Sequence, residues 1–195
     1  EMSIKAGDIV GLLYDAFYKQ YKDPTKESSL KSLNMLCVRL VFCLYAEDAG
    51  IFGRKGMFHD YLSAYDARNM RKVLIELFQV LDTKPENRDP YLDEKLAEFP
   101  YVNGGLFKNE DIEIPNFTDE IRALLLSKAS EDFNWSEISP TIFGAVFEST
   151  LNPETRRKGG MHYTSIENIH KVIDPLFMED LTKEFDEIRD IKVLR

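Results

Sequence analysis

The chain lacks several features that would define a metal-binding or membrane protein. It has only two cysteines in 195 residues, and Cys37 and Cys43 are six positions apart, not at the close spacing of a zinc or redox pair. We therefore expect two buried thiols and no metal site. No run approaches about 18 apolar residues and the first residues do not resemble a signal peptide, so we expect a cytoplasmic protein without a membrane span.

An excess of positive charge is also missing. Lys and Arg number 25 against 34 Asp and Glu, which gives a formal net charge of −9. A protein that wraps nucleic acid needs clustered basic residues to neutralise phosphates, so any contact of this chain with DNA must be local. The length suits one domain with the edge of a second.

Apolar residues recur at the helical period along most of the chain up to position 151. The longest such stretch, residues 29–48, is the expected hydrophobic centre, and Gly50 supplies its end. We therefore predict an all-α fold, a multi-helical bundle. The spacing predicts helices over residues 8–22, 29–48, 57–65, 66–81, 117–130 and 141–151, and residues 91–99 also suit a short helix.

Residues 99–115 interrupt this helical pattern. Asn103 and Gly104 stand between apolar residues and form a strong turn signal, because both accept positive φ. Ile112 and Ile114 alternate with acidic residues as in a short strand. We expect a short hairpin or an irregular loop here. The glycines lack the strand-to-helix context of a nucleotide-binding loop.

Three features of the sequence invite a functional interpretation that the residues do not favour: an adjacent acid pair, a histidine and a tryptophan. Glu47 and Asp48 are adjacent acids, but neighbours on a helix point about 100° apart, so we expect a solvated or ion-paired helix end with Arg39 as a structural partner of Glu47. His59 has no partner ligand and is expected to be a packed or surface residue. Trp135 is interpreted as an anchor of its corner, with stacking on a base as the alternative.

The most informative stretch is residues 158–169. Basic residues run into two glycines, and Thr164 and Glu167 then have the spacing of a capping box at a helix start. The first turn of a helix has unpaired N–H groups and a partial positive charge, which favour a ligand carboxylate or phosphate. Most capped helix starts bind nothing, so the pattern alone favours a plain helix cap.

The sequence Gly-Met-His-Tyr-Thr-Ser at positions 160–165 resembles motif X, the Gly-Ala-His-Tyr-Thr-[Pro/Ser] segment that opens the methyltransferase domain of adenine-specific DNA methyltransferases. In that family the segment contacts the amino-acid end of S-adenosylmethionine. The resemblance implies that His162, Tyr163, Thr164 and Ser165 line a cofactor site, with the N–H groups of the last two facing the cofactor's carboxylate.

Residues 44–52, 99–107 and 138–144 resemble parts of the helical spacer of the MmeI-like family, in the family's order and ahead of motif X. These are single-chain restriction-modification enzymes in which a nuclease, a helical spacer, an adenine methyltransferase and a DNA-recognition domain follow one another. The resemblance implies a helical spacer over residues 1–155 and the start of the methyltransferase domain over residues 156–195.

The motifs that perform methyl transfer are absent. The chain has neither the glycine-rich strand end that holds the cofactor nor the polar-Pro-Pro-aromatic loop that grips the target amine, and it has no nuclease motif. Residues 152–155 lack the second proline and the aromatic, so we assign no catalytic residue. The chain therefore resembles a piece of a longer enzyme, whose helical C-terminal segment, residues 166–194, would contact domains that are not included.

Two functional hypotheses follow. In the first, implied by the resemblance, the parent enzyme transfers a methyl group from S-adenosylmethionine to the exocyclic amine of adenine in double-stranded DNA, and this piece supplies the spacer and part of the cofactor site. In the second, which we favour for the isolated piece, it is a spacing and interaction module that binds neither cofactor nor DNA alone. Arg156, Arg157 and Lys158 form either a solvated basic turn, the commoner case, or a contact with DNA phosphate.

Overall fold

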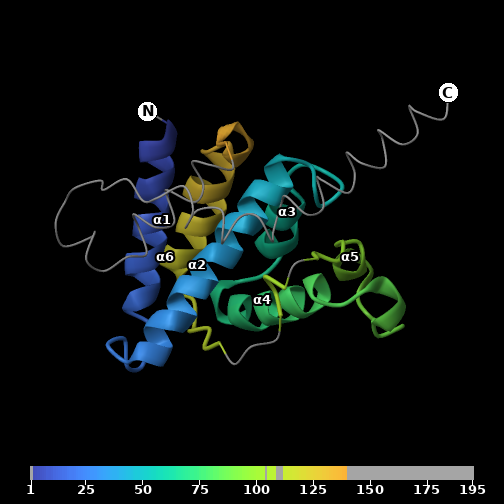
Figure 1. The fold of residues 1–195 in the computed structure, drawn as a ribbon, viewed down its shortest axis with the longest axis horizontal. Helices are drawn as coiled ribbons and strands as arrows, with labels where there is room; N and C mark the ends of the chain where they lie inside the picture. The colour runs from blue at the N-terminus through green and yellow to red at the C-terminus, as the bar shows by residue number, and fades with distance from the viewer. Residues whose placement is uncertain (1, 104, 109–111, 140–195) are drawn as a thin grey trace, which may run out of the picture.

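The fold was analysed in a computed structural model that describes residues 2–103, 105–108 and 112–139. All regular structure in these ranges is helical, so the all-α prediction is confirmed (Figure 1). The elements are the α-helices α1 (Met2–Tyr18), α2 (Glu27–Asp48), α3 (Met57–Ser63), α4 (Ala67–Leu81), α5 (Glu94–Ala97) and α6 (Asp119–Ala123), the 3-10 helices η1 (Pro85–Asn87) and η3 (Trp135–Glu137), and the π-helical segment η2 (Leu124–Glu131).

Helix α2 is the centre of the fold. It lies diagonally across the molecule in Figure 1, and α1, α3 and η3 pack against it. In the described part of the chain it is the one helix long and apolar enough to cross a membrane, but 67% of its apolar window is buried inside the protein, as in a core helix. Gly50, at φ 74°, adopts the left-handed conformation that lets the chain turn away after the helix.

The predicted helix over residues 8–22 is displaced in the structure. Helix α1 already includes Met2, because Ala6 is fully buried and extends the apolar face towards the N-terminus, and it ends at Tyr18. The chain then turns through residues 19–25, a stretch that includes Pro24. The other long helices lie within a few residues of their predicted ranges, and the Asp66 side chain caps α4 by accepting a hydrogen bond from the N–H of Asn69.

The predicted helix over residues 117–130 is present, but as an α-helical segment followed by a π-helical one. Thr118 caps α6 by accepting a hydrogen bond from the N–H of Ile121 at 3.1 Å. From Leu124 the chain continues as the π-helical segment η2, whose end is marked by a bond of 2.9 Å from the N–H of Asp132 to the carbonyl of Ser127. The apolar period predicted a helix here, but it carries no signal for the wider turn.

Of the two alternatives for residues 99–115, the described residues form the irregular loop, without a strand. Side chains of the helices and of the turn after α1 hold this loop where a partner strand would otherwise do so. The hydroxyl of Tyr21 donates to the carbonyl of Glu113 at 2.7 Å, and the N–H of Glu113 donates to the hydroxyl of Ser32 at 2.9 Å. Ile114 is buried and its carbonyl accepts a bond from the Arg71 side chain. The alternation at Ile112 and Ile114 thus reflects one buried face of a coil.

Candidate functional site at the end of helix α2

The predicted cofactor-binding residues His162, Tyr163, Thr164 and Ser165 lie outside the described residues. The basic turn from Arg156 to Lys158 and the predicted helices after position 140 do so as well. Their roles stay predictions. The site that the structure does describe is the C-terminal end of α2, where the buried Glu47 meets several half-buried polar side chains.

Glu47 is in the last turn of α2, and it is 1% exposed. One carboxylate oxygen accepts a hydrogen bond from the backbone N–H of His59 at 2.8 Å, and the other accepts one from the hydroxyl of Ser130 at 2.7 Å. The expectation of a solvated or ion-paired helix end with Arg39 as the partner of Glu47 was wrong, because α3 and η2 cover this end. Burial raises the pKa of Glu47, and the two hydrogen-bond donors oppose that rise.

Asp48 holds the segment that follows η2. Its carboxylate accepts a hydrogen bond of 2.7 Å from the backbone N–H of Trp135, and burial raises the pKa of Asp48 above its usual value. The Trp135 indole is 1% exposed, donates to the carbonyl of Ala129 at 2.7 Å and packs edge-on against Phe133 with ring centroids 4.8 Å apart. The anchor interpretation of Trp135 is therefore confirmed, and its ring face is covered, so it cannot stack on a base.

His59 is a packed histidine, as expected. Its Nε2 lies 3.2 Å from a carboxylate oxygen of Glu131 and its Nδ1 lies 3.4 Å from one of Asp60. Cys37 and Cys43 are both buried thiols, as predicted, and burial raises the pKa of the Cys43 thiol. Among the described residues there is no group of three or more His, Cys, Asp and Glu side chains that could hold a metal ion.

These contacts join the end of α2 to three other elements. We call the set formed by Glu47, Asp48, His59, Ser130 and Trp135 the α2 latch. Sequence reasoning identified the two acids and the tryptophan separately but did not bring them together, because their partners lie 12 to 87 positions away along the chain. The role of Ser130 left no signal in the sequence.

Arginine side chains perform a second structural role. Four of the six arginines in the described ranges donate hydrogen bonds to backbone carbonyls of loops or helix ends. Arg39 is 4% exposed, donates to the carbonyls of Leu106 and Lys108 at 2.9 Å each, and lies near the rings of Phe78 and Phe107. An arginine held in this way stabilises a loop and is not free to contact a phosphate.

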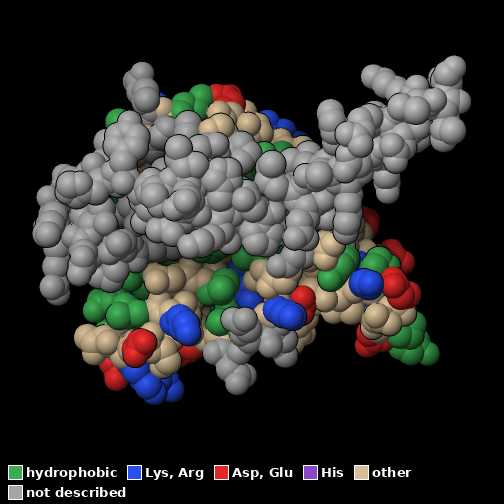
Figure 2. Space-filling model, viewed as in Figure 1, with side chains coloured by type: hydrophobic (Ala, Val, Ile, Leu, Met, Phe, Trp, Pro, Cys, Tyr) green, Lys and Arg blue, Asp and Glu red, His purple; other side chains and the backbone are tan. Residues whose placement is uncertain are grey.

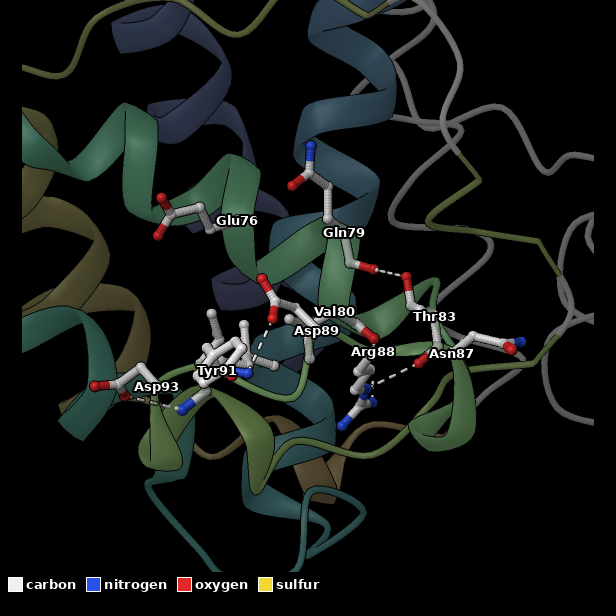
Figure 3. Close-up of a pocket in the computed structure, with 11 residues that line it drawn as sticks. Glu76, Gln79, Val80, Thr83, Asn87, Arg88, Asp89, Tyr91 and Asp93 are labelled. Carbon is white, nitrogen blue, oxygen red and sulfur yellow. Dashed lines mark hydrogen bonds between the residues drawn. The ribbon is translucent and has the colours of Figure 1, made fainter.

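Arg88 is the most fully engaged of these residues. It lies at a surface hollow of about 440 Å³ between α4, η1 and α5 (Figure 3). It donates to the carbonyls of Val80, Thr83, Ala97 and Phe99 at 2.8 to 3.1 Å. The guanidinium therefore ties the end of α4 to the chain on both sides of α5. We call Arg88 and the four carbonyls that it contacts the clamp, and we interpret the hollow as the space beside it. The polar sequence of this loop did not reveal this role of Arg88.

Comparisons with known proteins agree with this architecture. Residues 31–107 match the family model described as the MmeI helicase spacer domain. Over 184 residues the chain is 37% identical to DNA methyltransferase A of Bacillus subtilis (strain 168), covering 93% of this chain and 20% of that protein. The structure is similar to that of the type IIL restriction-modification enzyme MmeI, solved in complex with DNA, with a TM-score of 0.67, 39% identity, and coverage of 95% of this chain and 24% of that one.

The chain thus spans about a fifth of the curated relative and about a quarter of the solved structure that it matches. The resemblance identified from the sequence is confirmed by the family model, by the relative and by the fold. Residues 31–107 are therefore a helicase spacer domain of the MmeI type, and the chain as a whole is similar to part of an MmeI-like restriction-modification enzyme.

Proposed function

We propose that the chain is the helical spacer, residues 1–155, together with the start of the methyltransferase domain, residues 156–195, of a longer DNA methyltransferase from a restriction-modification system. The supporting observation is the collinear match to DNA methyltransferase A, which continues far beyond the family model's boundary at residue 107 and covers 93% of the chain. The family model covers residues 31–107 of the proposed spacer, and the match to the relative extends further along the chain, towards the motif X segment.

In this proposal the parent enzyme transfers a methyl group from S-adenosylmethionine to the exocyclic amine of adenine in double-stranded DNA. The sequence at positions 160–165 supports it through its resemblance to motif X. His162, Tyr163, Thr164 and Ser165 would line the cofactor site, where the N–H groups of a helix start suit the cofactor's carboxylate. The residues for the chemistry itself would lie in the domain downstream, so the isolated piece is not catalytic. The full-length enzyme would act in the cytoplasm, on DNA located there.

The test uses the full-length protein. Transfer of a labelled methyl group from S-adenosylmethionine to a DNA duplex, followed by nucleoside analysis, should yield N6-methyladenine. Tyr163→Ala should weaken cofactor binding by calorimetry about tenfold or more, because it removes one wall of the site. Tyr91→Ala is the matched control, since Tyr91 is 92% exposed in the loop before α5 and far along the chain from motif X. Methylation of cytosine, or none, would refute the proposal.

A second function is favoured for the isolated piece, that of a spacing module. The observation behind it is that the buried polar side chains described above, such as Glu47 and Arg39, are occupied with holding helices and loops together. A rigid helical body of this kind fixes the distance between the domains at its two ends. Calorimetry on the 195-residue chain with S-adenosylmethionine, and separately with duplex DNA, should then show no binding.

A further inference from the structure

We call residues 130–139 the exit segment, because the chain continues from them towards the motif X segment. Within this segment, Ser130 donates to Glu47, Glu131 lies 3.2 Å from His59, and Trp135 donates to Asp48. The exit segment is therefore held against the central helix by specific side-chain contacts.

The chemistry of these contacts favours one geometry. Each acceptor is a carboxylate, and hydrogen bonds to a charged acceptor are about twice as strong as those between neutral groups. Glu47 is buried, so losing a donor would leave a carboxylate oxygen without a partner, at a higher cost than the bond itself contributes. A displaced exit segment would lose the donors to Glu47 and Asp48 together, while the Trp135 ring would lose its buried position.

We propose that Asp48 and Ser130 are positioning residues for the methyltransferase domain: through the α2 latch they fix the point and direction at which the chain continues from the exit segment towards that domain. This inference rests on the proposed function. The sequence predicts that a helix begins directly after Ser139 and Pro140, and such a helix would carry the orientation of the exit segment onward. In the proposed function the motif X segment follows that predicted helix in the sequence, so its placement at the cofactor would depend on this orientation.

The expected consequence is a change in cofactor affinity rather than in chemistry. If the latch opens, a smaller fraction of molecules has motif X in the binding position, and the apparent dissociation constant rises in proportion. In the full-length enzyme, Asp48→Ala and Ser130→Ala should each raise the KM for S-adenosylmethionine by about three- to tenfold with kcat changed less than about twofold, the size that loss of one hydrogen bond to a carboxylate allows.

Two further variants separate positioning from general destabilisation. Asp48→Asn keeps an oxygen that can accept the N–H of Trp135 and should restore most of the affinity. Asp8→Ala is the matched control, an exposed helical acid on α1 remote in sequence from the latch. Hydrogen exchange of the Trp135 amide in the same full-length proteins reports on the latch directly, and it should accelerate in Asp48→Ala but not in the control.

The inference is supported if faster exchange at Trp135 accompanies a higher KM and both are reversed in Asp48→Asn. It is overturned if exchange accelerates and the KM stays at the wild-type value, or if kcat and KM change alike in proportion to a lowered melting temperature. A full-length wild type that neither binds S-adenosylmethionine nor methylates DNA would overturn the proposed function, and this inference with it, irrespective of the exchange result.

Discussion

The end of α2 and the loop around α5 are both held together by polar side chains, but with opposite chemistry. At the end of α2, carboxylates accept hydrogen bonds from N–H and O–H groups. Around α5, the Arg88 guanidinium donates to four carbonyl oxygens. Elsewhere on the described surface that is visible in Figure 2, charged side chains of both signs are scattered.

This difference has a consequence for pH. A guanidinium stays protonated throughout the range in which proteins are stable, so the clamp around α5 should be insensitive to pH. Burial raises the pKa values of Glu47 and Asp48. The free energy of the α2 latch therefore depends on whether these two carboxyls are protonated. The same helical body therefore contains pH-dependent contacts at the end of α2 and pH-independent contacts around α5.

The largest expected effect is from removing the indole of the latch. Trp135→Ala should lower the free energy of unfolding by about 3–5 kcal/mol, because it leaves a large cavity in a fully buried position. Denaturant unfolding of the 195-residue chain measures this change. Phe133→Leu, which keeps most of the apolar volume beside the indole, should cost much less, and an equal loss in the two variants would argue against the indole as the anchor.

Breaking the clamp should have the next largest effect. Arg88→Ala should cost about 1–3 kcal/mol, since several part-buried carbonyls lose a charged donor. Arg88→Lys should recover only part of the loss, because an ammonium cannot reproduce the planar fork of donors. The matched control is Arg68→Ala at an exposed ion pair, which should change stability by less than about 1 kcal/mol. Full recovery with lysine would show that charge alone matters there.

The pH contrast itself should be visible in Glu47→Gln. The folded-state pKa of Glu47 lies above the unfolded value near 4.5, so the folded protein takes up a proton first as pH falls through that window. Wild-type stability therefore gains a contribution at low pH and loses it as pH rises through the folded pKa, while the variant has no such term. Unfolding curves at several pH values should show wild type gaining stability relative to the variant as pH falls towards the unfolded value of 4.5. A pH-independent difference would contradict the raised pKa.

The smallest expected effect is at the rim of the hollow beside the clamp. Tyr91 is 92% exposed although it is aromatic, and its backbone N–H is bonded to the Asp89 side chain. Tyr91→Ala keeps that backbone bond and should change the free energy of unfolding by less than about 0.5 kcal/mol. A larger loss in thermal unfolding would mean that the ring packs against the chain in solution.

The sequence was sufficient for the elements whose cause is local. The apolar period placed α2 and α4, Gly50 marked the end of α2, and Asp66 was available as a cap. It was insufficient where long-range partners decide. The loop that contains Glu113 looked like a possible strand because the alternation of its residues carries no information about Tyr21 and Ser32, which are distant in the chain.

The candidate site shows the same division. The acids Glu47 and Asp48 were visible, but adjacency on a helix suggested solvent, and only the packing of α3 and η2 over them shows why they are buried. Resemblance rather than periodicity identified the family. The comparisons confirmed that identification, whereas the residues around Thr164 are still known only by their sequence.

The central claim is that this chain is a spacer and the first part of a methyltransferase domain, completed by sequence outside it. Calorimetry with S-adenosylmethionine on the 195-residue chain and on the full-length protein tests it most directly. We predict binding by the full-length protein that Tyr163→Ala weakens, and none by the 195-residue chain. Absence of binding in the full-length protein, or binding that Tyr163→Ala leaves unchanged, would contradict the account.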